Sequence, residues 1–125
     1  MIVVDASAAI QACLAADGFA LFGDERLTAP ALLWSEGSSV LHEMRARKEI
    51  SATLADAAFE RLLDAPISVR STNRLRREAW RVAENLGWMK TYDAEYVAAH
   101  TLGFEQLRCG ADDRESSDRH QSKFI

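Results

Sequence analysis

The sequence predicts an α/β domain with a short parallel sheet, because short apolar segments alternate with segments long enough to be helices. Residues 2–5, 26–29 and 67–70 have the length and composition of strands. Strands separated by helical segments of this length pair in parallel through right-handed crossovers. We therefore expect one sheet with helices between its strands.

The first half of the chain alternates between strand and helix. The apolar run 2–5 predicts a buried strand, and the small-residue segment 6–16 predicts a helix that is apolar on nearly every side. A second short strand is expected at 26–29. Pro30 suits the first turn of a helix, because its missing N–H is not needed there, and this helix is expected to run to about Lys48.

The middle of the chain predicts another helix and a third strand. Ser51 is a good N-cap for a helix over 52–64, since its hydroxyl can accept a backbone hydrogen bond. Pro66 ends that helix, and residues 67–70 alternate in polarity as a strand does.

Two further helices are expected after the third strand. Asn73 begins an amphipathic helix that Gly87 ends, and Thr91 caps a helix that runs to Leu102 with Gly103 behind it. The apolar stripe of the first of these helices consists of Leu75, Ala79, Val82, Ala83 and Leu86.

The composition is that of an ordinary globular domain. The chain has 125 residues, a hydrophobic content of 48% and a net charge of −4, so we expect one domain and no overall attraction to nucleic acid. No apolar run approaches the roughly 20 residues of a membrane span, and no signal peptide is evident. Cys13 and Cys109 form neither a disulfide nor a zinc pattern, so a reducing cytoplasm is the expected location.

Three acids in separate segments are candidates for a shared site. Asp5 ends the first strand, at the edge where ligands collect in α/β sheets, although an N-cap role explains it equally well. Glu36 lies at the margin of an apolar helical stripe, where a solvated rim glutamate is the plainer interpretation. Asp93 stands in a first helical turn, which the helix dipole favours. Carboxylates from distant segments are what Mg²⁺ requires, because it prefers oxygen ligands.

The order of three motifs resembles the PIN-domain family, and in particular the VapC-type toxins of bacterial toxin–antitoxin pairs. The motifs are VVDAS at residues 3–7, PALLWSE at residues 30–36 and TYDAEYVAAH at residues 91–100. The last motif is the most specific, and the resemblance extends from Met1 to about Gly103.

The resemblance implies a three-layer α/β/α domain that cleaves RNA with Mg²⁺ or Mn²⁺. It implies that Asp5, Glu36 and Asp93 are catalytic metal ligands and that Ser7 places a hydroxyl near the metal or the scissile phosphate. It also implies an antitoxin protein as partner. Carboxylates held together repel one another by about 4 kcal/mol per pair at about 4 Å, and a bound cation relieves that repulsion.

The chain departs from the family pattern after Gly103. The family continues with an apolar strand that ends in a fourth acid, whereas residues 110–125 here are mostly polar and charged. We expect a domain over residues 1–109 and an irregular or disordered tail over 110–125. Asp112, or else Asp113, stands where the fourth metal ligand would be, and the altered tail is expected to weaken activity.

Partner surfaces are also expected. Apolar side chains that one small domain cannot cover predict a homodimer and an antitoxin groove. The candidates for that groove are Trp34, Leu54, Phe59 and Leu62. Trp80 is expected to lie in the core, and His100 at its edge. The arginines near residues 45–48 and 70–77 are interpreted either as an RNA-binding surface or as solvated helix faces.

Two other functions remain open. One is a PIN-like domain that dimerises and binds an antitoxin without efficient RNA cleavage. The other is a phosphatase or phosphoacceptor domain built on Asp5, for which Lys90 is weak support because no matching motif surrounds it.

Overall fold

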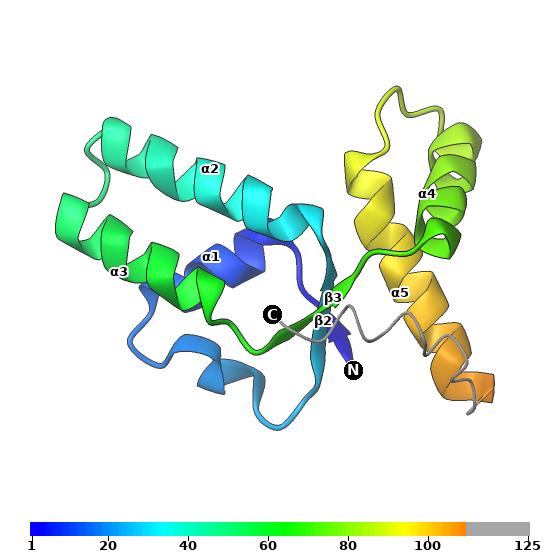
Figure 1. Cartoon of the computed structure of the whole chain (residues 1–125), viewed down its shortest axis with the longest axis horizontal. Helices are drawn as coiled ribbons and strands as arrows, with labels where there is room; N and C mark the ends of the chain where they lie inside the picture. Colours follow the sequence, from blue (N-terminus) through cyan, green and yellow to red (C-terminus); the bar gives the residue numbers. More distant parts are fainter. Residues whose placement is uncertain (110–125) are drawn as a thin grey trace.

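A parallel sheet forms the centre of the molecule in the computed structural model, which describes residues 1–109 (Figure 1). The strands are β1 (Ile2–Val3), β2 (Leu27–Pro30) and β3 (Ile67–Arg70), in the order β1-β2-β3, and both pairs are parallel. The predicted α/β class and the short parallel sheet are therefore confirmed. The tail over 110–125, with Asp112 and Asp113, lies outside the described residues.

Helices lie on both sides of the sheet, as a three-layer arrangement requires (Figure 1). On one side are α1, α2 and α3, and on the other are α4 and α5. The helices are α1 (Ala6–Leu14), the short 3₁₀ helix η1 (Gly18–Phe22), α2 (Leu32–Ala46), α3 (Ala52–Leu63), α4 (Asn73–Leu86) and α5 (Tyr92–Cys109). Sequence reasoning missed η1. None of the helices in the described part of the chain has the length and apolar character needed to cross a bilayer.

Two hydrophobic cores lie on opposite faces of the sheet. The larger core joins β1, β2 and β3 to α1, α2 and α3 and contains Val4, Leu33 and Leu62. The smaller core joins α4 to α5 mainly through alanines, and Val3 packs against it. Val3 and Val4 belong to different cores because successive side chains of an extended segment point to opposite faces.

Local capping signals correctly predicted several helix ends. The Ser51 hydroxyl accepts a hydrogen bond from the Leu54 N–H at 3.0 Å, at the start of α3. Gly87 ends α4 in the left-handed conformation, with φ of 71°. Such caps act within a few residues, so the sequence alone identifies them.

Pro30 is the last residue of β2 rather than the first turn of α2, which corrects the prediction. The carbonyl of Thr28 accepts from the Val4 N–H, so Thr28 faces β1, and Pro30, two residues later, faces the same way. The chain has already left β1 for α1 at that level. The missing N–H of Pro30 therefore leaves no partner unsatisfied.

Gly103 lies inside α5 and does not end it, contrary to the prediction. A Cβ at this position would collide with the side chain of Met1, which crosses the helix there. The glycine therefore permits close packing of the N-terminus against α5, and a purely local interpretation could not detect this contact.

Trp80 is not a core residue, because its side chain is 68% exposed. The buried face of α4 is formed by Leu75, Ala79 and Ala83, which pack against alanines of α5. Trp80 lies about 100° around the helix from Ala79. It stands beside the contact between α4 and α5 and not within it.

Candidate functional site

Asp5 connects the first strand to the first helix. Its side chain caps α1, with Oδ1 accepting a hydrogen bond from the Ala8 N–H at 2.9 Å. The structural role expected for this residue is therefore present. The cap engages one carboxylate oxygen and leaves Oδ2 at the surface end of the helix, where Asp5 is exposed.

Glu36 is tied to the opposite helical layer by a hydrogen bond. The hydroxyl of Tyr96, on α5, donates to Oε1 of Glu36, on α2, at 2.7 Å. Glu36 is half-buried and stands next to the buried Gly37, so its side chain leaves the helix at the edge of the core. This hydrogen bond orients the carboxylate and engages one of its two oxygens.

Three carboxylates act electrostatically on the Tyr96 hydroxyl. Burial raises the pKa of Tyr96, and the hydrogen bond to Glu36 and the negative charges of Glu36, Asp5 and Glu95 raise it further. A negative charge nearby makes phenolate formation unfavourable. The tyrosine is therefore neutral, and it marks a region where carboxylates from α2, α5 and the start of α1 approach one another.

Glu95 is an acid of this region that sequence reasoning missed. Burial raises the pKa of its carboxyl group, the positive charge of Arg76 lowers it, and the negative charge of Glu36 raises it. Glu95 belongs to the first turn of α5 together with Asp93. The motif drew attention to Asp93, although the same first turn already contained a second acid.

Asp93 and Ser7 have different positions relative to this cluster. Asp93 is exposed in the first turn of α5. Ser7 is exposed on α1 and lines a groove that Glu36 also lines. Among the described side chains, no group of three or more His, Cys, Asp or Glu residues is gathered closely enough to hold a metal ion. The predicted three-acid metal site thus stays a prediction.

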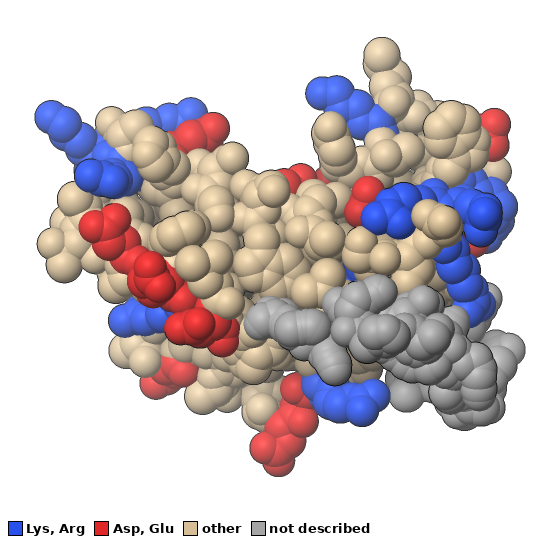
Figure 2. Space-filling model, in the orientation of Figure 1, with Lys and Arg blue, Asp and Glu red and all other residues tan. Residues whose placement is uncertain are grey.

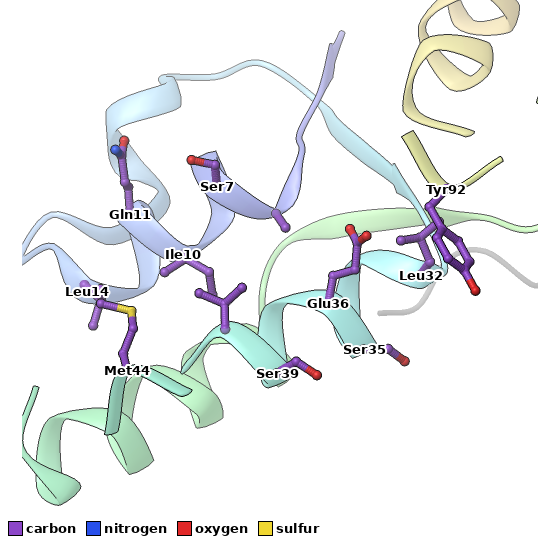
Figure 3. A pocket seen from close by; sticks show the side chains of 12 residues that line it. Ser7, Ile10, Gln11, Leu14, Leu32, Ser35, Glu36, Ser39, Met44 and Tyr92 are labelled. Atoms are coloured by element: carbon purple, nitrogen blue, oxygen red, sulfur yellow. The ribbon is translucent and has the colours of Figure 1, made fainter. Parts of the chain in front are cut away.

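The groove lies between α1 and α2 and has a volume of about 880 Å³. Figure 3 shows Glu36 pointing from α2 into this space, with Tyr92 at the end nearest α5. Figure 2 shows a hollow between the two helical layers, with acidic atoms at its bottom. The apolar part of the lining comes from Ala6, Ile10, Leu14, Leu32, Val40 and Met44.

The residues predicted to form a partner surface on α2 and α3 differ in exposure. Leu62 is fully buried, and the indole N–H of Trp34 donates to the Leu62 carbonyl at 3.1 Å. Trp34 and Leu62 therefore join α2 to α3, whereas Phe59 on α3 is 38% exposed, and the antitoxin surface stays a prediction. A separate apolar groove lies on the other side of α2, against α1. His100, expected at the core edge, is exposed, because it lies on the outer side of α5 from Ala98 and Ala99.

Replacing Glu95 with glutamine should stabilise the protein near neutral pH. A carboxyl group with a raised pKa in the folded state favours folding below its ordinary pKa of about 4.3, and this contribution is lost as the pH rises through the folded value. The charged Glu95 therefore opposes folding at pH 7. Urea unfolding should show Glu95→Gln to be more stable than wild type at pH 7, with the difference vanishing near pH 4.

The matched control is Glu84→Gln, which changes an exposed glutamate on α4 and should leave stability unaltered. If Glu95→Gln were less stable than wild type at pH 7, attraction to Arg76 would outweigh the cost of burial.

No protein-family model and no curated protein matches this chain.

Proposed function

We propose that the protein is an endoribonuclease dependent on Mg²⁺ or Mn²⁺ and that it acts as the toxin of a VapBC-like toxin–antitoxin pair. The observation that carries the proposal is the cluster around Tyr96. The Tyr96 hydroxyl donates a hydrogen bond to Glu36, and the negative charges of Asp5 and Glu95 also act on it. The cluster stands where β1 leads into α1, at the carboxyl end of a parallel strand, which is the usual place for ligands in α/β folds.

The donor atoms suit a hard divalent cation. Asp5 and Glu36 each use one oxygen to hold the side chain, through the Ala8 N–H and the Tyr96 hydroxyl. The second oxygen of each carboxylate would bind the ion, since Mg²⁺ and Mn²⁺ take oxygen ligands. Asp93 would complete the set, because its exposed side chain can turn without disturbing the core. Asp112 is the proposed fourth ligand from the sequence alone.

Each residue has a distinct part in this mechanism. When bound, the cation would lower the pKa of a water molecule and stabilise charge on the scissile phosphate. Asp5, Glu36 and Asp93 would position the cation, and Tyr96 would hold the Glu36 carboxylate in one orientation. Ser7 lines the same groove as Glu36, and its hydroxyl would donate a hydrogen bond to a phosphate oxygen.

A binding domain without efficient cleavage is the second candidate. The groove between α1 and α2 favours it, because an apolar channel suits a helix or extended segment of an antitoxin. We propose a homodimer for either function. A basic side chain from the antitoxin would reach the acids at the end of the groove and prevent cation or RNA binding.

The purified protein should cleave single-stranded RNA only when Mg²⁺ or Mn²⁺ is added. A radiolabelled RNA resolved on a denaturing gel measures this, and a chelator in excess should stop the reaction. Calorimetry should show the same ions binding in the absence of RNA. Ion binding without cleavage would favour the binding domain, and cleavage that persists in chelator would contradict the proposed mechanism.

A further inference from the structure

The outer face of α4 combines an exposed tryptophan with a surplus of positive charge. Trp80 is 68% exposed, and α4 contains four arginines and two glutamates in a chain whose net charge is −4. Figure 2 shows basic side chains gathered on this side of the hollow. Burial does not explain Trp80, since the contact with α5 is made by Leu75, Ala79 and Ala83.

Helical spacing places Trp80 among arginines. Arg76 precedes it by four residues and Arg77 by three, so both arginines lie on neighbouring parts of the helix surface. Arg76 is held by Asn73 and Ser71 through hydrogen bonds of 3.2 Å and 3.0 Å, both to neutral side chains. Within residues 1–109 we find no hydrogen bond or ion pair for Arg77. These two charges are therefore not cancelled by ion pairs.

Arg76 also connects this face to the acidic cluster. Its guanidinium donates to the Ser71 hydroxyl directly after the carboxyl end of β3, and Asp5 follows the carboxyl end of β1 at the same edge of the parallel sheet. The basic face of α4 thus begins where the acidic cluster ends. An RNA strand with one phosphate bound at the acidic cluster would extend over Arg76 towards Arg77 and Trp80.

We propose that Arg76, Arg77 and Trp80 form a binding surface for single-stranded RNA next to the acidic cluster. Trp80 stacks on an unpaired base, and the arginines bind the flanking phosphates. Stacking suits any base, because every base has an aromatic face, and the arginines supply the charge complementarity. The inference rests on the proposed RNA substrate and names the part of the protein that holds the RNA away from the cleaved bond.

Binding is tested without cleavage by measuring fluorescence anisotropy of a labelled oligouridine of about 12 nucleotides in chelator. Trp80→Ala should weaken binding about tenfold or more, whereas Trp80→Phe should keep most of the affinity because phenylalanine also stacks. Arg77→Gln should reduce the slope of log affinity against log salt by about 0.7, the value for one lost phosphate contact on a single strand.

The matched controls change residues of the same kind on the other helical layer. Phe59→Ala alters an exposed aromatic residue of α3, and Arg47→Gln removes an exposed charge that follows α2. Both should bind the oligouridine as wild type does. Circular dichroism of every variant should match wild type, because Trp80 and Arg77 are exposed.

The outcomes separate this inference from the proposed function. Weakened binding by Trp80→Ala in a protein that never cleaves RNA would support the surface and contradict the nuclease. Unchanged affinity of Trp80→Ala in a protein that does cleave RNA would overturn the surface alone. Failure of wild type to bind oligouridine would also overturn it. A change in oligomeric state on light scattering, with RNA affinity unchanged, would assign the face to a second copy of the chain.

Discussion

Replacing Asp5 with asparagine should abolish metal-dependent RNA cleavage while leaving the fold intact. Asparagine caps a helix about as well as aspartate does, so the hydrogen bond from the Ala8 N–H to Oδ1 can persist. The negative charge that would bind the cation is lost. We expect cleavage to fall by at least about 100-fold, the upper end of the loss seen when an outer partner of a metal ligand is removed.

Glu36→Gln provides a parallel test with the same logic. In the wild type the Tyr96 hydroxyl donates a hydrogen bond to Oε1 of Glu36 at 2.7 Å. The amide oxygen of glutamine can accept the same hydrogen bond. Cleavage and calorimetric affinity for Mn²⁺ should therefore both fall without loss of the contact between α2 and α5. Asp56→Asn, which changes an exposed acid on α3, should retain full activity.

The variants also distinguish a cap from a ligand. Asp5→Ala loses both roles and should lower the free energy of unfolding by about 1 kcal/mol, whereas Asp5→Asn should not. Wild-type cleavage by Asp5→Asn would show that the activity comes from another site or from a contaminating nuclease.

Two acids in the first turn of α5 can be compared directly. The family resemblance implies that Asp93 is the ligand, although the negative charge of Glu36 also acts on Glu95 and raises the pKa of its carboxyl group. We expect Asp93→Asn to lose cleavage and Glu95→Gln to retain it. The opposite result would assign the metal ligand to Glu95.

Truncation of Leu62 should cost about 3 kcal/mol of stability, because a fully buried leucine leaves a cavity when cut to alanine. Leu62 packs against the backbone of α2 at Gly37, where a Cβ would lie 3.0 Å from Cδ2 of Leu62. The neighbouring Leu63 is 42% exposed, so Leu63→Ala is the matched control and should change stability by less than about 0.5 kcal/mol. Urea unfolding measures both.

Gly37→Ala should partly rescue Leu62→Ala. With the leucine present, the added methyl group is crowded, which offsets the gain of about 1 kcal/mol in helix propensity. With the leucine removed, the methyl group fills part of the cavity and the propensity gain is realised. A double-mutant cycle should show coupling above about 0.5 kcal/mol, and additive effects would contradict the predicted contact.

Sequence reasoning worked where the determining interaction is local. The order of strands and helices and the caps at Ser51 and Gly87 follow from residues a few positions apart. The cap role of Asp5, one of two roles that its position in the sequence allows, is local in the same way. The predictions for Pro30 and Gly103 were wrong, because contacts distant in the sequence decide both positions. Pro30 can end β2 because β1 has already ended at that level of the sheet. Gly103 lies within α5 because the side chain of Met1 packs against it.

The sequence by itself determined the α/β class, the helix caps and the positions of the acids along the chain, because periodicity and capping act within one or two turns. Only the tertiary structure decided which groups meet. The hydrogen bond between Tyr96 and Glu36 joins residues that are 60 positions apart in the sequence. The partial burial of Glu95 and the exposure of Trp80 depend on the close packing of α4 against α5, which the alanines between the two helices allow. Such contacts depend on packing between layers, which no local pattern encodes.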